Sequence, residues 1–191
     1  MTELRNSSAE ASQPRANQQL RTLQIIVGAI ASGALFFMLV VIAIAGSPSK
    51  AAQPMVAYVG LAFAAAVLLG RFFFTLLSDR QAVKTACDAE IPARVRAHQR
   101  DLARLAVDGQ PTDDAMLLWP RFLTRVMVSV AMIEGAVFLN LIAYMIEHQL
   151  FSLIVAAVLL VYILLHFPTN SAFINWARNI VDQAARRGTP S

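Results

Sequence analysis

Residues Leu23–Ala45 read LQIIVGAIASGALFFMLVVIAIA, a run of 23 positions that contains no charged side chain. The hydrocarbon core of a bilayer, about 30 Å thick, requires roughly 20 apolar residues in a helix that rises about 1.5 Å per residue. A helix also pairs its backbone N–H and C=O groups internally, as a medium without water requires. The run therefore predicts a membrane-spanning helix.

Three further apolar runs follow in the chain, and each is long enough, or nearly so, to span a bilayer. Of the 191 residues, 57% are apolar and 15% are charged, against usual values of about 45–50% and 25%. Four such runs leave too little chain to cover them in water, which argues against a soluble domain. The runs are Met55–Leu77 (charged residue Arg71), Phe122–Ile146 (Arg125 and Glu134) and Leu150–Phe167 (His166 at its end).

The Lys and Arg residues predict how these runs are oriented. Fifteen of the sixteen cations lie on one side of the predicted spans, and Lys50, between the first two spans, lies on the other. Loops rich in Lys and Arg stay in the cytoplasm. We therefore expect a multi-pass protein of the cell membrane with both termini cytoplasmic. Cleavage after Ala43–Ala45 remains an alternative, although the first run exceeds the 7–15 residues of a signal core.

The predicted fold class is all-α, an integral membrane four-helix bundle with additional cytoplasmic and interfacial amphipathic helices. Two short matches, Gly33–Phe36 with Gly135–Phe138 and Ala65–Leu69 with Ala156–Leu160, suggest two related helical hairpins, with chance similarity of apolar helices as the alternative. The expected segments are a disordered N-terminus (1–19), a first hairpin (20–77, spans 23–45 and 55–77), a basic helical connector (78–121), a second hairpin (122–167, spans 122–146 and 150–167), an interfacial amphipathic helix (168–183) and a disordered tail (184–191).

Glu134 is the polar residue that the sequence places deepest in the membrane, about twelve positions from either end of its span. An ionised acid there costs roughly 2.5–3.5 kcal/mol, which the apolar residues of the same span offset. A mid-membrane acid is a candidate for carrying a proton or binding a cation. The alternative is a neutral acid that hydrogen-bonds a neighbouring backbone group or serine.

The segment Met132–Leu139 resembles the acid-bearing helix of the rotary ATPase proteolipids, short helical hairpins in which the acid carries the ion. The resemblance departs from that family in two respects. This chain lacks the dense glycine repeat of the partner helix, and Glu134 lies in the first helix of its hairpin rather than the second. We therefore do not assign the chain to that family.

Three more residues are expected to make polar contacts inside the membrane. Arg71 lies six residues before the end of its span, so its long side chain can reach the headgroups, with Glu134 as the alternative partner. Asn140 and Tyr144 are four residues apart on one helix face. Such side chains commonly hydrogen-bond across membrane helices, which holds the helices together.

The connector contains a basic stretch with apolar residues at roughly helical spacing. This pattern predicts a short amphipathic helix that binds anionic lipid headgroups or an acidic partner; a solvated charged linker is the alternative. No nucleic-acid motif accompanies the cations, so nucleic acid is not an expected partner. The lipid- or partner-facing cations are Arg94, Arg96, Arg100 and Arg104.

Aromatic residues mark the predicted ends of the membrane region. Trp119 precedes the third span, where a tryptophan typically lies at the interface. Phe173 and Trp176 begin an apolar stripe at helical spacing after Pro168. We expect this stripe to lie on the inner leaflet, or to dock on another protein. The three residues are therefore predicted interfacial anchors.

No constellation in the sequence points to catalysis. The three histidines are far apart, Cys87 is the sole cysteine, and no phosphate-binding loop is present. We therefore expect no enzyme, no metal and no cofactor. The favoured hypothesis is a structural or assembly component whose partners are lipids, a second copy or another membrane protein. The alternative is an oligomeric protein that handles protons or cations through Glu134.

Overall fold

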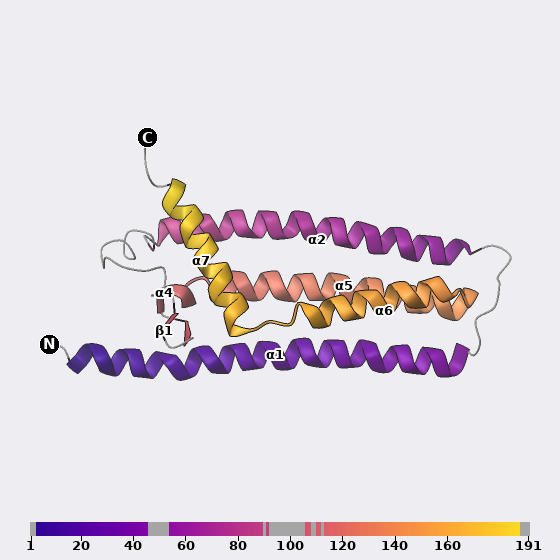
Figure 1. Cartoon of the computed structure of the whole chain (residues 1–191), viewed down its shortest axis with the longest axis horizontal. Coiled ribbons are helices and arrows are strands. Elements are labelled where there is room, and N and C mark those ends of the chain that lie inside the picture. Colours follow the sequence, from indigo (N-terminus) through magenta and orange to yellow (C-terminus); the bar gives the residue numbers. More distant parts are fainter. Residues whose placement is uncertain are drawn as a thin grey trace. The chain divides into compact units, whose positions relative to one another are not determined.

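The computed structural model describes residues 3–45, 54–89, 91, 106–107, 110–111 and 113–187, with side chains described from residue 18 in the first helix. The described part of the chain is helical apart from turns and one short pairing in which strand β1 (Ala106–Val107) runs antiparallel to β2 (Gln110–Pro111). The described helices are α1 (Glu3–Ala45), α2 (Met55–Asp88), the one-turn α4 (Asp113–Met116), α5 (Trp119–Glu147), α6 (Leu150–Leu165) and α7 (Asn170–Arg187), labelled in Figure 1.

Three of these helices are long and apolar enough to cross a bilayer, within α1 from Gln18, in α2 and in α5. This result confirms the first three predicted spans as candidates. The fourth differs, because α6 ends at Leu165 and its 16 residues extend only about 24 Å. It qualifies only together with α7, from which it is bent by 77°. The structure thus supports three spans, or four if the bent pair is one span.

The helices extend beyond the predicted segment boundaries. α1 begins at Glu3, so residues 3–19, for which we expected disorder, continue the helix of the first span. α2 likewise continues through the first part of the predicted connector to Asp88, and α7 continues to Arg187 in the predicted tail. Ala, Glu, Arg and Gln, frequent in these extensions, are good helix formers.

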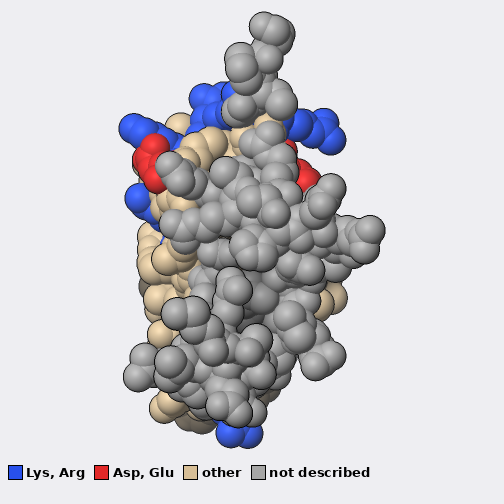
Figure 2. Space-filling model, turned by 90° about the vertical axis from the view of Figure 1, so that its left-hand side faces the viewer, with Lys and Arg blue, Asp and Glu red and all other residues tan. Residues whose placement is uncertain are grey.

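The chain divides into two compact units, which differ in charge. Residues 25–74 and 126–167, here the apolar unit, contain two of the sixteen Lys and Arg residues, Lys50 and Arg71. The remaining residues form the basic unit and hold the other fourteen cations. In Figure 2, most of the visible Lys and Arg side chains lie around the upper edge of the face, and one lies at its lower edge. The division by contacts therefore coincides with a division by charge.

Within the apolar unit, the α5–α6 hairpin lies between α1 and α2 (Figure 1). The rings of Phe37 in α1 and Phe138 in α5 meet edge to face at 5.2 Å. α2 contacts the other side of the hairpin, where the Tyr58 ring lies 5.9 Å from that of Phe151 in α6. Leu160 of α6 in turn lines a groove beside α1. Contacts thus link all four helical segments of this unit.

The apolar unit is apolar outside as well as inside. Its core contains Val27, Ile133 and Leu141, which are at most 2% exposed. Its surface carries large apolar side chains, among them Phe36, Leu69 and Leu165, each more than 60% exposed. Of the large apolar residues that are exposed in the described chain, all but Leu76, Leu77 and Leu117 belong to this unit. An apolar surface of this extent is typical of a lipid-facing or interaction surface.

Candidate functional site

Glu134 lies near the middle of α5, with its side chain partly buried. Among the described residues, none forms a hydrogen bond or an ion pair with its carboxyl group. The described residues also contain no cluster of three or more His, Cys, Asp or Glu side chains that would hold a metal ion. Within the described residues, the Glu134 carboxyl group therefore forms no hydrogen bond with a backbone group or a serine side chain, which was the structural alternative for this residue.

Asn140 joins α5 to α2 in the core of the apolar unit. Its side chain is fully buried, and its Nδ2 donates to the carbonyl oxygens of Gly60, at 3.1 Å, and of Ala136 in its own helix, at 2.8 Å. A Cβ atom added at Gly60 would lie only 2.9 Å from Oδ1 of Asn140. Glycine at position 60 therefore allows the amide to approach the α2 backbone.

Arg71 contacts Tyr162 of α6. Its guanidinium donates a hydrogen bond to the tyrosine hydroxyl, and its Cζ lies 4.6 Å from the ring centroid. The His166 ring also contacts Tyr162, with ring centroids 4.1 Å apart and ring planes tilted by 42°. Tyr144, which we expected near Asn140, is 2% exposed, and its ring lies 6.2 Å from that of His148. Sequence reasoning did not identify Tyr162 as the contact of Arg71.

Glu147, the last residue of α5, is a polar contact that sequence reasoning missed. Its two carboxylate oxygens accept hydrogen bonds from the backbone N–H groups of Val56, at 2.6 Å, and Ala57, at 2.8 Å. Both groups lie in the first turn of α2, where backbone N–H groups lack partners within the helix. A negative charge at this end also interacts favourably with the helix dipole. Glu147 therefore caps α2 from another helix.

In the basic unit, the three predicted anchors, Trp119, Phe173 and Trp176, pack together with a fourth ring, that of Phe122. The Phe173 centroid lies 5.2 Å from that of Trp119 and 5.1 Å from that of Phe122, and Phe122 lies 5.4 Å from Trp176. Phe173 is fully buried, and Trp119 and Trp176 are less than 10% exposed. We call these four residues the aromatic cluster. Their role at a membrane interface stays a prediction.

Asp79 of α2 bonds to the aromatic cluster and links three helices, and the sequence analysis did not identify it. Its Oδ1 accepts a hydrogen bond from Nε1 of Trp176 in α7, at 2.9 Å, and forms an ion pair with Arg125 in α5, at 3.1 Å. The Arg125 guanidinium lies 5.9 Å from the Trp176 ring centroid. The acid thus holds the end of α2, the start of α5 and α7 together. No periodic signal in the sequence links these positions.

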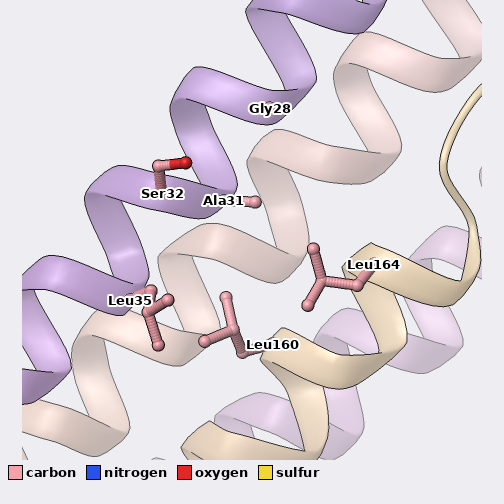
Figure 3. Close-up of a pocket in the computed structure, with 6 residues that line it drawn as sticks. All are labelled: Gly28, Ala31, Ser32, Leu35, Leu160 and Leu164. Carbon is pink, nitrogen blue, oxygen red and sulfur yellow. The ribbon is translucent and has the colours of Figure 1, made fainter.

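A groove opens between α1 and α6 of the apolar unit, with a volume of about 160 Å³ (Figure 3). It is lined by Gly28, Ala31, Ser32 and Leu35 of α1 and by Leu160 and Leu164 of α6. The small side chains of α1 leave this space, and the Leu side chains in Figure 3 point into it. The groove carries one hydroxyl, that of Ser32, and offers no charged group.

The four basic residues Arg94, Arg96, Arg100 and Arg104 lie outside the described residues. Their predicted contacts with lipid headgroups or an acidic partner stay predictions. In comparisons with known proteins, no family model, no curated protein and no solved structure matches the chain.

Proposed function

We propose that the chain is a multi-pass membrane protein that acts as a structural or assembly component rather than as an enzyme. The observation that carries this proposal is the apolar unit, whose core and surface are both apolar. In water such a surface is unfavourable by about 25 cal/mol for each Å² exposed, whereas in a bilayer it faces hydrocarbon. The contacts among α1, α2, α5 and α6 favour a four-helix bundle within the membrane.

The use of the polar groups in this unit supports a structural role. Asn140 binds the backbone of α2, Arg71 binds Tyr162 of α6, and Glu147 caps α2. Each of these side chains is engaged in holding helices together, which is the common use of polar residues in membrane bundles. In the described part of the chain, no group of metal ligands accompanies them.

The charge division supports an orientation with the basic unit on the cytoplasmic side, together with both termini. Fourteen of the sixteen cations belong to that unit. In this orientation the basic connector lies near anionic headgroups, where each Lys or Arg contributes about 1 kcal/mol of binding. The aromatic cluster and α7 are then placed toward the interface of the inner leaflet.

The assembly role is tested by charge reversal in the basic connector. We expect replacement of Arg94, Arg96, Arg100 and Arg104 by Glu to remove anionic lipid or a partner that otherwise remains bound after mild detergent extraction. The matched control reverses Arg80, Lys84, Arg186 and Arg187, four cations of the same unit outside the basic stretch 94–104. Mass spectrometry of the purified proteins provides the measurement. Equal retention by both variants would count against the proposal.

A second candidate function, proton or cation handling, is favoured by one observation. The carboxyl group of Glu134 has no hydrogen-bond or ion-pair partner among the described residues, although it lies in the middle of a candidate span. Proton and cation flux into liposomes containing the purified protein tests this function. Under this candidate, Glu134→Gln abolishes the flux. Absence of flux in the parent protein, or flux that is unchanged in the variant, eliminates it.

A further inference from the structure

The middle of α5 presents a face that no other described part of the chain covers. Ala131, Gly135 and Ile142 are exposed on this face, and Glu134 lies at its edge. A Cβ atom added at Gly135 would meet no atom within 4 Å. The face therefore combines a polar group, a backbone that can be approached closely and apolar surroundings.

Glu134 differs from the other charged residues described in the apolar unit. Arg71 and Glu147 both form hydrogen bonds to a neighbouring helix, whereas the Glu134 carboxyl makes no hydrogen bond to a described residue. The Glu134 side chain is only partly covered by the chain itself. In the proposed membrane placement its carboxyl group faces hydrocarbon, where no water can supply the missing hydrogen bonds. A partner that carries both a donor and an acceptor would satisfy this group.

We propose that this face is the contact surface for a second copy of the chain, with the two Glu134 carboxyl groups hydrogen-bonded to each other. In its neutral form a carboxylic acid has one O–H donor and a carbonyl acceptor, so it is complementary to its own copy. Two copies inserted in the same orientation are related by a two-fold axis along the membrane normal. Residues near that axis meet their own counterparts.

Gly135 makes the close approach of two such helices possible. Small residues allow the backbones of membrane helices to approach, and the resulting packing drives their association. Gly60 and Gly70 are explained by contacts within the chain, because an added Cβ atom would lie 2.9 Å from Asn140 and 3.1 Å from Met132. As at Gly28 and Gly33, no contact within the described chain explains Gly135, although glycine in a helix costs about 1 kcal/mol relative to alanine. Gly135 differs from those two glycines in lying next to Glu134, which has no hydrogen-bond partner among the described residues.

Energy transfer between differently labelled copies in phosphatidylcholine vesicles tests this proposal, which rests on the proposed membrane placement. The exposed Cys87 in the basic unit is the labelling site. We expect Glu134→Leu to weaken association about five- to thirty-fold, the equivalent of one interhelical hydrogen bond of about 1–2 kcal/mol. Glu134→Gln should preserve association, because an amide also pairs with its own copy. This result distinguishes a contact role from ion handling, which the same change abolishes.

Two substitutions of matched glycines test the geometry. Gly135→Leu should reduce association at least as strongly as Glu134→Leu, because it separates the helices. Gly33→Leu, at an equally open position on α1, should leave association unchanged. In a Cys87→Ser background, oxidation should link copies carrying Ile142→Cys. Copies carrying Val158→Cys, on the exposed face of α6, should stay unlinked.

The outcomes separate failure of this inference from failure of the proposed function. A chain that inserts into vesicles but gives no energy transfer overturns the contact between copies and leaves the membrane placement intact. Equal loss in the Gly33→Leu and Gly135→Leu variants also overturns it. A chain that does not enter vesicles contradicts the proposed function itself. Melting followed by circular dichroism confirms that each variant is folded before association is compared.

Discussion

At the scale of single residues, the apolar unit is held together by a small number of polar contacts between helices. Asn140 and Gly60 form the most buried of these contacts, because the amide bonds directly to the α2 backbone. The two positions are 80 residues apart in the chain. The sequence indicated that Asn140 would bond across helices, but it contained no signal for the partner, since glycine offers only its backbone.

We expect Gly60→Ala to destabilise the protein by about 1–3 kcal/mol, because the new Cβ atom would overlap the buried Asn140 amide. Gly33→Ala is the matched control, because a Cβ atom there meets open space and alanine is the better helix former. Its stability should stay equal or rise slightly. The measurement is thermal unfolding in detergent followed by circular dichroism. Equal stabilities of the two variants would show that the close approach at Gly60 is absent.

The capping contact of Glu147 leads to a second prediction at this scale. We expect Glu147→Ala to destabilise the protein by about 0.5–2 kcal/mol, because two backbone N–H groups at the start of α2 lose their acceptor. Glu147→Gln should retain part of the effect, since the amide oxygen still accepts. Amide hydrogen exchange at Val56 and Ala57 provides the local measurement. Unchanged exchange in the alanine variant would contradict the cap.

At the scale of elements, the apolar stripe of α7 shows what sequence periodicity can and cannot predict. The residues that the spacing placed on one apolar face, among them Phe173, Trp176 and Ile180, are buried within the chain, whereas we expected lipid or another protein to cover them. It did not reveal what covers that face. In the structure the cover is formed by Trp119 and Phe122 of α5, with Asp79 of α2 bonded to the edge. A periodic stripe specifies that a face is apolar, but lipid and protein cover it equally well.

Replacement of Asp79 tests its contact with Trp176 of α7. We expect Asp79→Ala to destabilise the docking of α7 by about 1.5–3 kcal/mol, because a hydrogen bond and an ion pair to one carboxylate are lost. Both tryptophans of the chain belong to the aromatic cluster, so intrinsic fluorescence reports on it directly. The emission should shift to longer wavelength.

The control for this experiment is Asp182→Ala, which removes an acid from α7 itself. It should leave the fluorescence unchanged, because Asp182 makes no contact with the aromatic cluster among the described interactions. An identical emission spectrum of Asp79→Ala and the parent protein would show that Asp79 does not hold α7.

The spans were predictable to the extent that run length decides them. Leu23–Ala45 and Met55–Leu77 lie within candidate spans of the structure, because long apolar runs leave few other solutions. The fourth run was overestimated. It contains 18 positions before Pro168, among them the polar residues Ser152 and His166, but the helix ends at Leu165 and the chain bends before α7. Composition gives the length of a run, whereas the geometry of the following turn decides where the helix ends.

At the scale of the whole molecule, the chain consists of an apolar unit and a basic unit, and the proposed membrane placement depends on this difference in composition. The two units are distinguished by their internal contacts, and fourteen of the sixteen Lys and Arg residues belong to one of them. The proposed membrane placement would account for both, because hydrocarbon would cover the apolar surface and anionic headgroups would attract the cations. In the sequence, the lengths of the apolar runs predicted the spans, and the positions of Lys and Arg predicted an orientation that stays a prediction.

Labelling with a membrane-impermeant maleimide on intact cells tests this account most directly. Cys87, which is exposed in the basic unit, should react only after the cells are lysed. In a Cys87→Ser background, Ser49→Cys, which lies between the first two predicted spans, should react in intact cells. Labelling of Cys87 from outside, or recovery of the chain in the aqueous fraction without detergent, would contradict the account.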